Sequence, residues 1–476
     1  MGDQIRNSIF LNPVTSHTIN ELISKLKNKS AGPDQIPAYI LKLTKYIISP
    51  VLAALFNDCF KCGKFPDVFK EAKIIPLFKG GDSTQVTNYR PISLLPYFGK
   101  LFEKVIFKQL MKFFNKHNVI SPNQYGFRKC YSTSLAVSEI VDDLVQGIEE
   151  NLYTCTIFLD LAKAFDSVDH SILLLKLERY GIRGIALDLM KSYLSDRKQF
   201  VKINQTVSSA VTLKIGVPQG SVLGPLLFIL FINDLPNSSN FKTKLFADDT
   251  CLTLKSNTVD VLQRNVNFEL TKVYDWLITN KLTLNISKSK FMIVTKKNNE
   301  NLHKFKVKIN GERLEKCNSY KYLGVYVDDQ LNWRTHINHI SQKISKACGV
   351  LSKARYISNH KTLKMIYYAI VYSYLQYCNI AWGSAQATVL APLQAALNKI
   401  IKTLNFASFD VSNVDSLYKS FDLLTLKQIH DLEVVKLMYK HKNELLPQKF
   451  QDYFTPVATV HTHNTHSRTR DNFFIP

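Results

Sequence analysis

The sequence has no apolar run long enough to cross a membrane. Its longest run, from Val222 to Ile232, is shorter than the roughly 20 residues that a transmembrane helix requires and includes Gly224 and Pro225. The first residues include Asp3 and no apolar segment, so we expect no secretory signal and no membrane partner. The sequence also lacks internal repeats and low-complexity segments, which excludes repeat arrays.

Cysteine is scarce as well. Eight cysteines are scattered over 476 residues, and Cys59 and Cys62 have the spacing of half a zinc site without a second pair nearby. We interpret this pair as structural and expect reduced thiols, which are typical of an intracellular protein of the cytoplasm, the nucleus or both.

Acidic residues are few beside the basic ones. The chain has 61 Lys and Arg but only 38 Asp and Glu, for a net charge of +23. Residues 1–155, 156–330 and 331–476 are each net positive, so the charge is not confined to a tail. Such a distributed field favours a long polyanion and predicts a nucleic-acid partner, although a generally basic protein would look similar.

Hydrophobic residues make up 46% of the chain, enough for a sizeable core. The patterning predicts helical and mixed material first, a strand-rich middle next and an almost wholly helical end. At the start, Thr18 and Glu21 match a capping box at the beginning of a helix. The expected strands lie at 73–79, 155–159, 199–203, 211–215, around Leu284, at 291–295 and within 306–327.

Two adjacent carboxylates, Asp248 and Asp249, lie between two short β-prone runs. This pattern predicts a tight hairpin with both acids at its tip. Like charges at one turn repel each other, and a divalent cation would neutralise them, although a solvated turn is the simpler alternative for the pair alone. A third acid, Asp160, ends the β-prone run 155–159. If the strands are neighbours, the three acids converge and suit two-metal phosphoryl transfer.

Two other acidic pairs lack a strand on each side. Asp142 and Asp143 follow a helical pattern, and Asp328 and Asp329 follow a strand at a loop. We interpret both pairs as unrelated to catalysis.

Eight short motifs occur in one order along the chain. They read KSAGPDQI at 29–36, NYRPISLL at 88–95, QYGFR at 124–128, FLDLAKAFDSVDH at 158–170, GVPQGSVLGP at 216–225, FADDT at 246–250, LNISKSK at 284–290 and YLGV at 322–325. In this order they closely resemble the reverse transcriptase of non-LTR (LINE-type, jockey-like) retrotransposons, over roughly residues 15–455.

The resemblance implies an α+β right-hand polymerase fold with fingers, a palm built on an antiparallel sheet, and a helical thumb. The implied regions are an N-terminal helical extension at 1–70, fingers at 71–155, a palm at 156–330 with a fingers insertion at about 171–215, a thumb at 331–460 and a loose tail at 461–476.

The resemblance also implies an RNA-directed DNA polymerase that extends a DNA primer on an RNA template by two-metal nucleotidyl transfer. Matching positions make Asp160, Asp248 and Asp249 the ligands of two Mg²⁺ ions, with Mn²⁺ as an alternative. Lys288 matches the general acid that serves the leaving pyrophosphate, whereas a solvated surface lysine is the alternative for this residue.

Further positions match substrate contacts. Phe165 matches the aromatic residue under the incoming sugar, which selects deoxynucleotides, and Gln219 and Gly220 match the loop against the nascent base pair and the template. A core aromatic is the alternative for Phe165.

Basic residues match positions that contact phosphate and template. Lys79 and Arg90 match the fingers residues that grip the triphosphate of the dNTP, for which a point charge and a forked guanidinium are both suited. Arg128 matches a template contact.

The implied partners are an RNA template, a DNA primer or nicked target DNA, and dNTPs. No residues match the endonuclease that precedes this domain in the family, so we expect that activity from a missing upstream domain of the parent element. Two alternatives remain: a catalytically silent, truncated or domesticated RNA-binding remnant, and a metal-dependent nuclease, which would have no need of Phe165.

Overall fold

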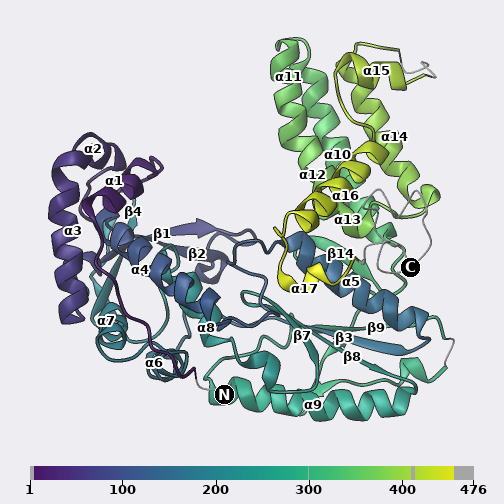
Figure 1. Cartoon of the computed structure of the whole chain (residues 1–476). Coiled ribbons are helices and arrows are strands. Elements are labelled where there is room, and N and C mark those ends of the chain that lie inside the picture. Colours follow the sequence, from purple (N-terminus) through teal and green to yellow (C-terminus); the bar gives the residue numbers. More distant parts are fainter. Residues whose placement is uncertain (1–4, 298–299, 409–412, 455–476) are drawn as a thin grey trace, which may run out of the picture. The chain divides into compact units, whose positions relative to one another are not determined.

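A computed structural model describes residues 5–297, 300–408 and 413–454 (Figure 1). The predicted tail at 461–476 lies outside these residues. The elements before residue 72 are helical, helices and strands are mixed between 72 and 328, and the described elements from 334 onward are helical, which confirms a mixed α+β architecture. The chain divides into two compact units: unit 1 comprises 1–127, 160–241 and 268–286, and unit 2 comprises 128–159, 242–267 and 287–476.

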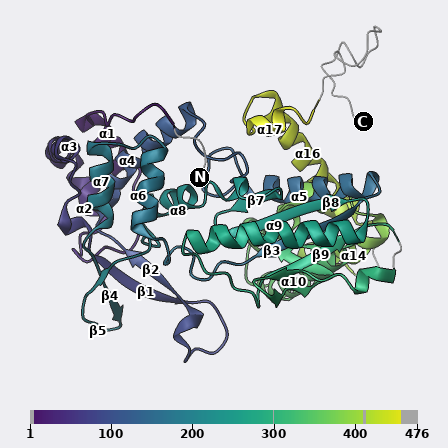
Figure 2. The ribbon, with the colours of Figure 1, turned by 90° about the horizontal axis from the view of Figure 1, so that it is seen from below.

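Unit 1 combines a helical layer with one sheet. Its helices are α1 (Ser16–Ser24), α2 (Ala38–Leu43), α3 (Lys45–Cys62), α4 (Tyr97–Lys116), α6 (His170–Arg179), α7 (Ile185–Leu194) and α8 (Leu223–Phe231). Its strands are β1 (Ala72–Phe78), β2 (Tyr89–Leu94), β4 (Arg197–Ile203), β5 (Thr206–Val207) and β6 (Val211–Leu213). The strand order is β2-β1-β4-β5, with β6 paired to β4, as Figure 2 shows for the labelled strands.

Unit 2 carries the second sheet and the C-terminal helices. Its strands are β3 (Tyr153–Leu159), β7 (Lys242–Phe246), β8 (Asp249–Ser256), β9 (Lys290–Val294), β10 (Lys308–Ile309), β11 (Glu312–Arg313), β12 (Glu315–Lys316), β13 (Ser319–Tyr322) and β14 (Val325–Asp328). Its helices are α5 (Thr133–Glu149), α10 (Arg334–Ala354), α11 (His360–Tyr367), α12 (Ser373–Gln376), α13 (Asn379–Trp382), α14 (Ala387–Leu404), α15 (Asp415–Ser420), α16 (Leu426–Lys442) and α17 (Gln448–Gln451). Helix α9 (Val259–Thr279) follows β8.

Short helical turns complete the list. They are η1 (Asp67–Phe69), η2 (Val86–Asn88), η3 (Leu235–Asn237), η4 (Glu300–His303) and the π-helical η5 (Tyr368–Tyr372).

The main sheet of unit 2 has the order β12-β9-β3-β8-β7. Its β9–β3, β3–β8 and β8–β7 pairs are antiparallel, and every residue of β3 is buried. Helix α5 packs against β3, β7 and β9. One apolar cluster includes Ile140 of α5, Phe158 of β3, Ile344 of α10 and Leu397 of α14, so the sheet and the C-terminal helices share a core.

Two local predictions are wrong. The first helix begins at Ser16 because Thr15, not Thr18, accepts the capping hydrogen bond, and Thr18 lies inside the helix as its donor. The strand expected around Leu284 is reduced to a single bridge with Leu161.

Among the described residues, no helix combines the length and the apolar composition needed to cross a bilayer.

Candidate active site

The Asp-Asp pair lies on a β-hairpin, as predicted. Strands β7 and β8 pair with Phe246 opposite Asp249, so Ala247 and Asp248 form a two-residue turn. Ala247 is buried and has φ of +53°, in the left-handed region, which for alanine costs roughly 1–2 kcal/mol. Asp248 and Asp249 are exposed. A strained backbone that holds two carboxylates at the surface is typical of a functional turn.

Asp160 follows the central strand of the same sheet. The last residue of β3, Leu159, pairs with Thr250 of β8. The strand that leads into Asp160 is therefore the direct neighbour of the strand that begins at Asp249, which confirms the predicted adjacency of the strands. The backbone carbonyl of Asp160 accepts a hydrogen bond from Asn285 N–H at 2.8 Å.

The role of these acids as metal ligands stays a prediction. Asp160 belongs to unit 1, whereas Asp248 and Asp249 belong to unit 2. Across the described part of the chain, no three His, Cys, Asp or Glu side chains are gathered as a metal site.

A buried charge network lies between β7 and α5. Lys244 of β7 is fully buried, with its Nζ 3.3 Å from Glu139 Oε1 and 3.2 Å from Asp143 Oδ2. Lys242, two residues earlier on β7, also pairs with Asp143, and Lys449 of α17 pairs with Glu139. Burial alone would raise the pKa of Asp143, but the charges of Lys244 and Lys242 lower it below its usual range. These ion pairs fasten the first strand of the Asp-Asp hairpin to α5.

Phe165 lies in a ring cluster of unit 1. Its ring stacks on Phe228 of α8 with centroids 4.4 Å apart and meets the edge of Phe127 at 6.4 Å. The carbonyl of Phe165 accepts a hydrogen bond from Val217 N–H at 2.8 Å, which ties this ring to the Gly216–Ser221 loop. The ring is half-buried, so part of it remains open to a ligand.

Gln219 and Gly220 lie in that same loop. Gln219 Nε2 donates to Asp166 Oδ1 at 2.9 Å, and the Gln219 carbonyl accepts from Ser93 N–H of β2 at 2.8 Å. Gly220 has φ of +117°, and a Cβ there would lie 2.6 Å from the carbonyl oxygen of Ser93. Only glycine allows this close approach of loop and strand. The structure thus joins Phe165, Gln219 and Gly220 in one assembly.

Lys79 and Arg90 lie on the hairpin of β1 and β2. Arg90 pairs with Leu77, and Lys79 N–H donates to the carbonyl of Asn88 at 2.8 Å. The alternation of side chains along strands places Lys79 and Arg90 on the same face of this hairpin, and both are exposed.

Two predicted residues lie elsewhere in unit 2. Lys288 is exposed in the loop before β9. The guanidinium of Arg128 lies 4.0 Å from the ring centroid of Tyr131, just before α5. Nothing in these contacts assigns either residue a role, so both stay predictions.

Several acids that stabilise the structure were not predicted from the sequence. Asp142 and Asp143 were predicted to lie on a helix without a catalytic role. Asp143 is nevertheless buried and binds lysines of β7. The i,i+4 spacing of Glu139 and Asp143 on one helix face is the signal that could have found them. Glu103 of α4 gave no local signal at all.

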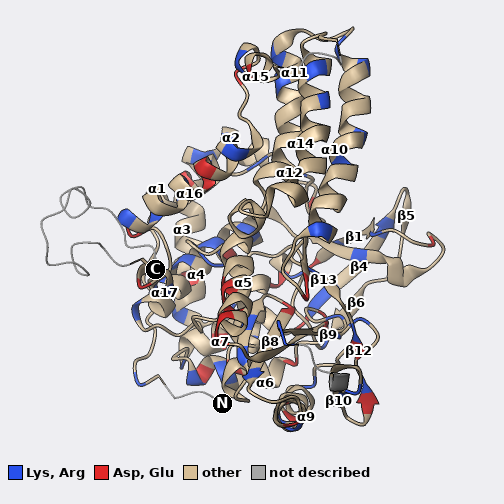
Figure 3. Cartoon of the chain, turned by 90° about the vertical axis from the view of Figure 1, so that its right-hand side faces the viewer, with Lys and Arg blue, Asp and Glu red and all other residues tan. Residues whose placement is uncertain are grey.

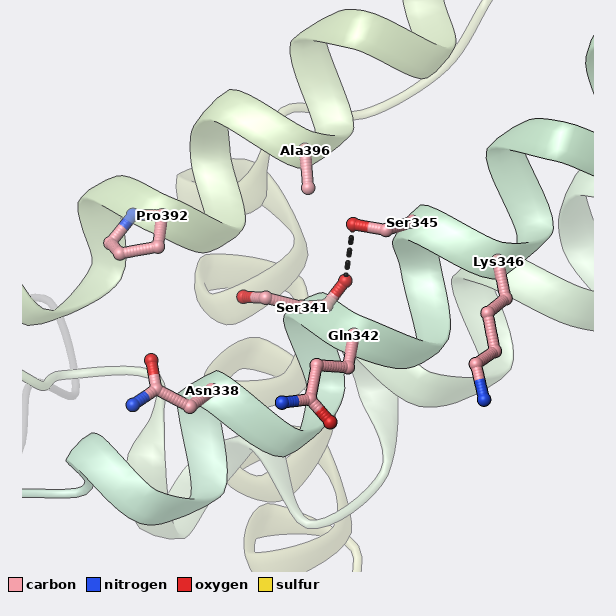
Figure 4. A pocket seen from close by; sticks show the side chains of 7 residues that line it. All are labelled: Asn338, Ser341, Gln342, Ser345, Lys346, Pro392 and Ala396. Atoms are coloured by element: carbon pink, nitrogen blue, oxygen red, sulfur yellow. Dashed lines mark hydrogen bonds between the residues drawn. The ribbon is translucent and has the colours of Figure 1, made fainter.

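A hollow of about 720 Å³ lies between α10 and α14 (Figure 4). It is lined by polar and small side chains, among them Asn338, Gln342, Lys346 and Ala396. Lys and Arg residues recur along α10 and α11 (Figure 3). Such a surface suits contact with a phosphate backbone.

Unit 2 presents two exposed carboxylates on a hairpin, and unit 1 presents a half-buried aromatic ring beside a glycine-containing loop. The family described as "Reverse transcriptase (RNA-dependent DNA polymerase)" matches residues 79–327, just over half of the chain. The chain therefore belongs to the reverse transcriptase family.

Its relatives are proteins of non-LTR retrotransposons, which confirms the resemblance found in the sequence. The RNA-directed DNA polymerase from mobile element jockey of Drosophila funebris is 31% identical over 410 residues, covering 83% of this chain and 44% of the relative. The probable RNA-directed DNA polymerase from transposon X-element of Drosophila melanogaster is 28% identical over 437 residues, covering 89% of this chain and 48% of the relative. The chain thus spans less than half of the length of these relatives.

Proposed function

We propose that this chain is an RNA-directed DNA polymerase that extends a DNA primer on an RNA template with dNTPs. The observation that carries the proposal is the register of the unit 2 sheet. It joins an exposed Asp248-Asp249 turn to the strand that leads into Asp160. Membership of the reverse transcriptase family supports it.

The finer architecture is a right hand. The antiparallel β9-β3-β8-β7 arrangement supports a palm, the β1–β2 hairpin with Lys79 and Arg90 supports fingers, and the helices from α10 onward support a thumb. The predicted boundaries near residues 71, 156 and 331 belong to this proposal.

Mg²⁺ would be held by Asp160, Asp248 and Asp249. The carboxylates suit a hard cation, and the exposed pair on a strained turn fits such a ligand set. When bound, the metal would activate the primer 3′-hydroxyl and stabilise the leaving pyrophosphate.

The remaining predicted residues would bind and orient the substrates. Lys79 and Arg90 would grip the triphosphate, and Gln219 and Gly220 would lie against the nascent base pair. The half-buried ring of Phe165 would exclude a 2′-hydroxyl.

Two further contacts complete this proposal. Lys288 would donate a proton to pyrophosphate, and Arg128 would contact the template. An endonuclease of the parent element would supply nicked target DNA inside the cell.

The test is primer extension on a primed RNA template with dNTPs and Mg²⁺. Asp248→Asn should lower the extension rate by roughly a thousandfold, because a lost ligand removes several kcal/mol of transition-state stabilisation. Asp329→Asn, in the acidic pair at the end of β14, is the matched control and should extend at the parental rate.

Two results would contradict the proposal. RNA binding without extension by the parent chain would favour a silent RNA-binding remnant. Equal extension rates for the parent and Asp248→Asn would show that the hairpin is not part of the catalytic site.

A further inference from the structure

A buried carboxylate lies beneath the loop that carries Gln219. Glu103 of α4 is fully buried, and its Oε2 accepts hydrogen bonds from Val222 N–H at 2.6 Å and Leu223 N–H at 3.0 Å. Both donors are at the start of α8, directly after Ser221 of the loop. The acid is thus more than 100 positions away in sequence from the backbone that it binds.

The start of α8 needs such an acceptor. The first N–H groups of a helix have no partner within the helix, and the capping position Val222 has no side chain that could serve. A carboxylate provides a charge-assisted bond and also interacts favourably with the positive end of the helix. Glu103 therefore acts as a cap donated by a different helix.

The surroundings of Glu103 fix the carboxylate in turn. Arg197 is 1% exposed, donates to the carbonyl of Tyr193 at 3.1 Å and lies over the Tyr193 ring at 4.7 Å. Burial raises the pKa of Glu103, and the charge of Arg197 opposes this rise without cancelling it. Glu103 and Arg197 are therefore both held away from solvent.

The loop above the cap is short and internally bonded. Ser221 Oγ donates to the Pro218 carbonyl at 2.8 Å and accepts from Gly224 N–H at 2.9 Å. A Cβ on Gly224 would lie 2.6 Å from Ser221 Oγ, so the loop is packed tightly against the helix start. A displacement of the start of α8 would therefore also displace Gln219.

We propose that Glu103 is a positioning residue, which holds the Gln219 loop in place for the incoming nucleotide by capping α8. The proposal rests on the polymerase function proposed above. It assigns no contact between Glu103 and substrate; the acid acts through the backbone of Val222 and Leu223.

Two variants separate the roles of the acceptor and the charge. Glu103→Leu removes the acceptor, whereas Glu103→Gln keeps one carbonyl oxygen for both donors. The Gln amide group would replace the other carboxyl oxygen, and the Tyr193 hydroxyl beside Glu103 can accept a hydrogen bond from it. Asp234→Leu is the matched control, because Asp234 is a buried acid of the same unit that pairs with Lys176 at 2.6 Å and does not touch the loop.

Hydrogen exchange and steady-state extension give the readouts. In Glu103→Leu, the amides of Val222 and Leu223 should exchange roughly tenfold faster or more, and the KM for dNTP should rise by a similar factor with a smaller change in kcat. Glu103→Gln should stay within about threefold of the parent in both measurements. Asp234→Leu should lower stability without changing the KM or the exchange of these amides.

Unchanged exchange in Glu103→Leu would overturn the cap. Faster exchange with the KM unchanged, or with the same KM change in Asp234→Leu, would overturn the positioning role. Hydrogen exchange does not require turnover, so an inactive parent chain would overturn the proposed function while the exchange rates still decide whether Glu103 holds the loop.

Discussion

In both units, a buried acid from a neighbouring helix anchors a turn, but the anchoring contacts differ in chemistry. In unit 1, Glu103 accepts two neutral backbone N–H groups beneath the Gln219 loop. In unit 2, Glu139 and Asp143 bind the ammonium group of Lys244 beside the Asp248 turn. The Gln219 loop is held by hydrogen bonds from backbone N–H groups to a carboxylate, whereas the Asp248 turn is held by ion pairs.

The difference appears in the pKa values of the two kinds of acid. Burial raises the pKa of Glu103, and the charge of Arg197 and the backbone donors oppose this rise only in part. The lysines around Asp143 outweigh its burial and lower its pKa. The unit 1 anchor should therefore tolerate loss of charge, whereas the unit 2 anchor should not.

The largest expected effect comes from breaking the charge balance. Lys244→Met removes the buried lysine that contacts both Glu139 and Asp143, and should lower the free energy of unfolding by about 3 kcal/mol, because Lys449 and Lys242 still compensate these acids in part. Urea denaturation measures this loss. Lys255→Met is the control on the neighbouring strand β8, where Nζ is 3.7 Å from Asp143 Oδ1, and should cost about 1 kcal/mol or less. Equal losses in the free energy of unfolding would show that Lys244 stabilises the fold no more than Lys255 does.

An intermediate effect is expected on the selection of the nucleotide sugar, which we assign to unit 1 alone. Phe165→Ala removes the ring of unit 1 and should relax the preference for dNTP over rNTP by roughly tenfold to a hundredfold, because a steric contact with one hydroxyl is lost. The ratio of kcat/KM for the two nucleotides measures it. Phe127→Ala, which removes the ring that meets Phe165 edge-on, is the control and should keep the preference. Unchanged sugar discrimination in Phe165→Ala would place the selection elsewhere.

The smallest effect is a pH dependence of opposite sign in the two units. The pKa of Asp143 is lowered from its usual 3.8, so its charged form stabilises the fold above that value and the stabilisation is lost as the pH falls. The pKa of Glu103 is raised from its usual 4.5, so its contribution is greatest at low pH and is lost as the pH rises.

Urea unfolding between pH 3 and pH 7 checks these signs. The stability advantage of the parent over Asp143→Asn should shrink on acidification, and its stability relative to Glu103→Gln should improve, each by about 1 kcal/mol. Parallel pH curves for the two variants would show that the two anchors do not differ in charge.

The local pattern of the sequence was sufficient for the hairpin. Alternation and two acids at a turn predicted β7, β8 and the position of Asp248. These features depend on neighbours in sequence, which periodicity records.

The features that sequence missed depend on partners far along the chain. Glu103 looks like any charged residue of a helix until α8 is placed above it. Asp143 has the same pattern as a solvated helical acid until Lys244 is buried against it. At the first helix, Thr15 and Thr18 both suit a cap, and Thr15 is the residue whose hydroxyl accepts from Thr18 N–H. The roles of Asp160, Lys288 and Arg128 stay predictions because no contact tests them.

The pairing of Lys449 with Glu139 has a consequence for the order of biosynthesis. These two residues are 310 positions apart, so a ribosome that adds about 5–20 residues per second needs roughly 15 to 60 s between them. During that interval α5 can pair with the lysines of β7, but Glu139 lacks its C-terminal partner. The ion-pair network of unit 2 is therefore completed only after Lys449 has been synthesised, long after α5 and β7.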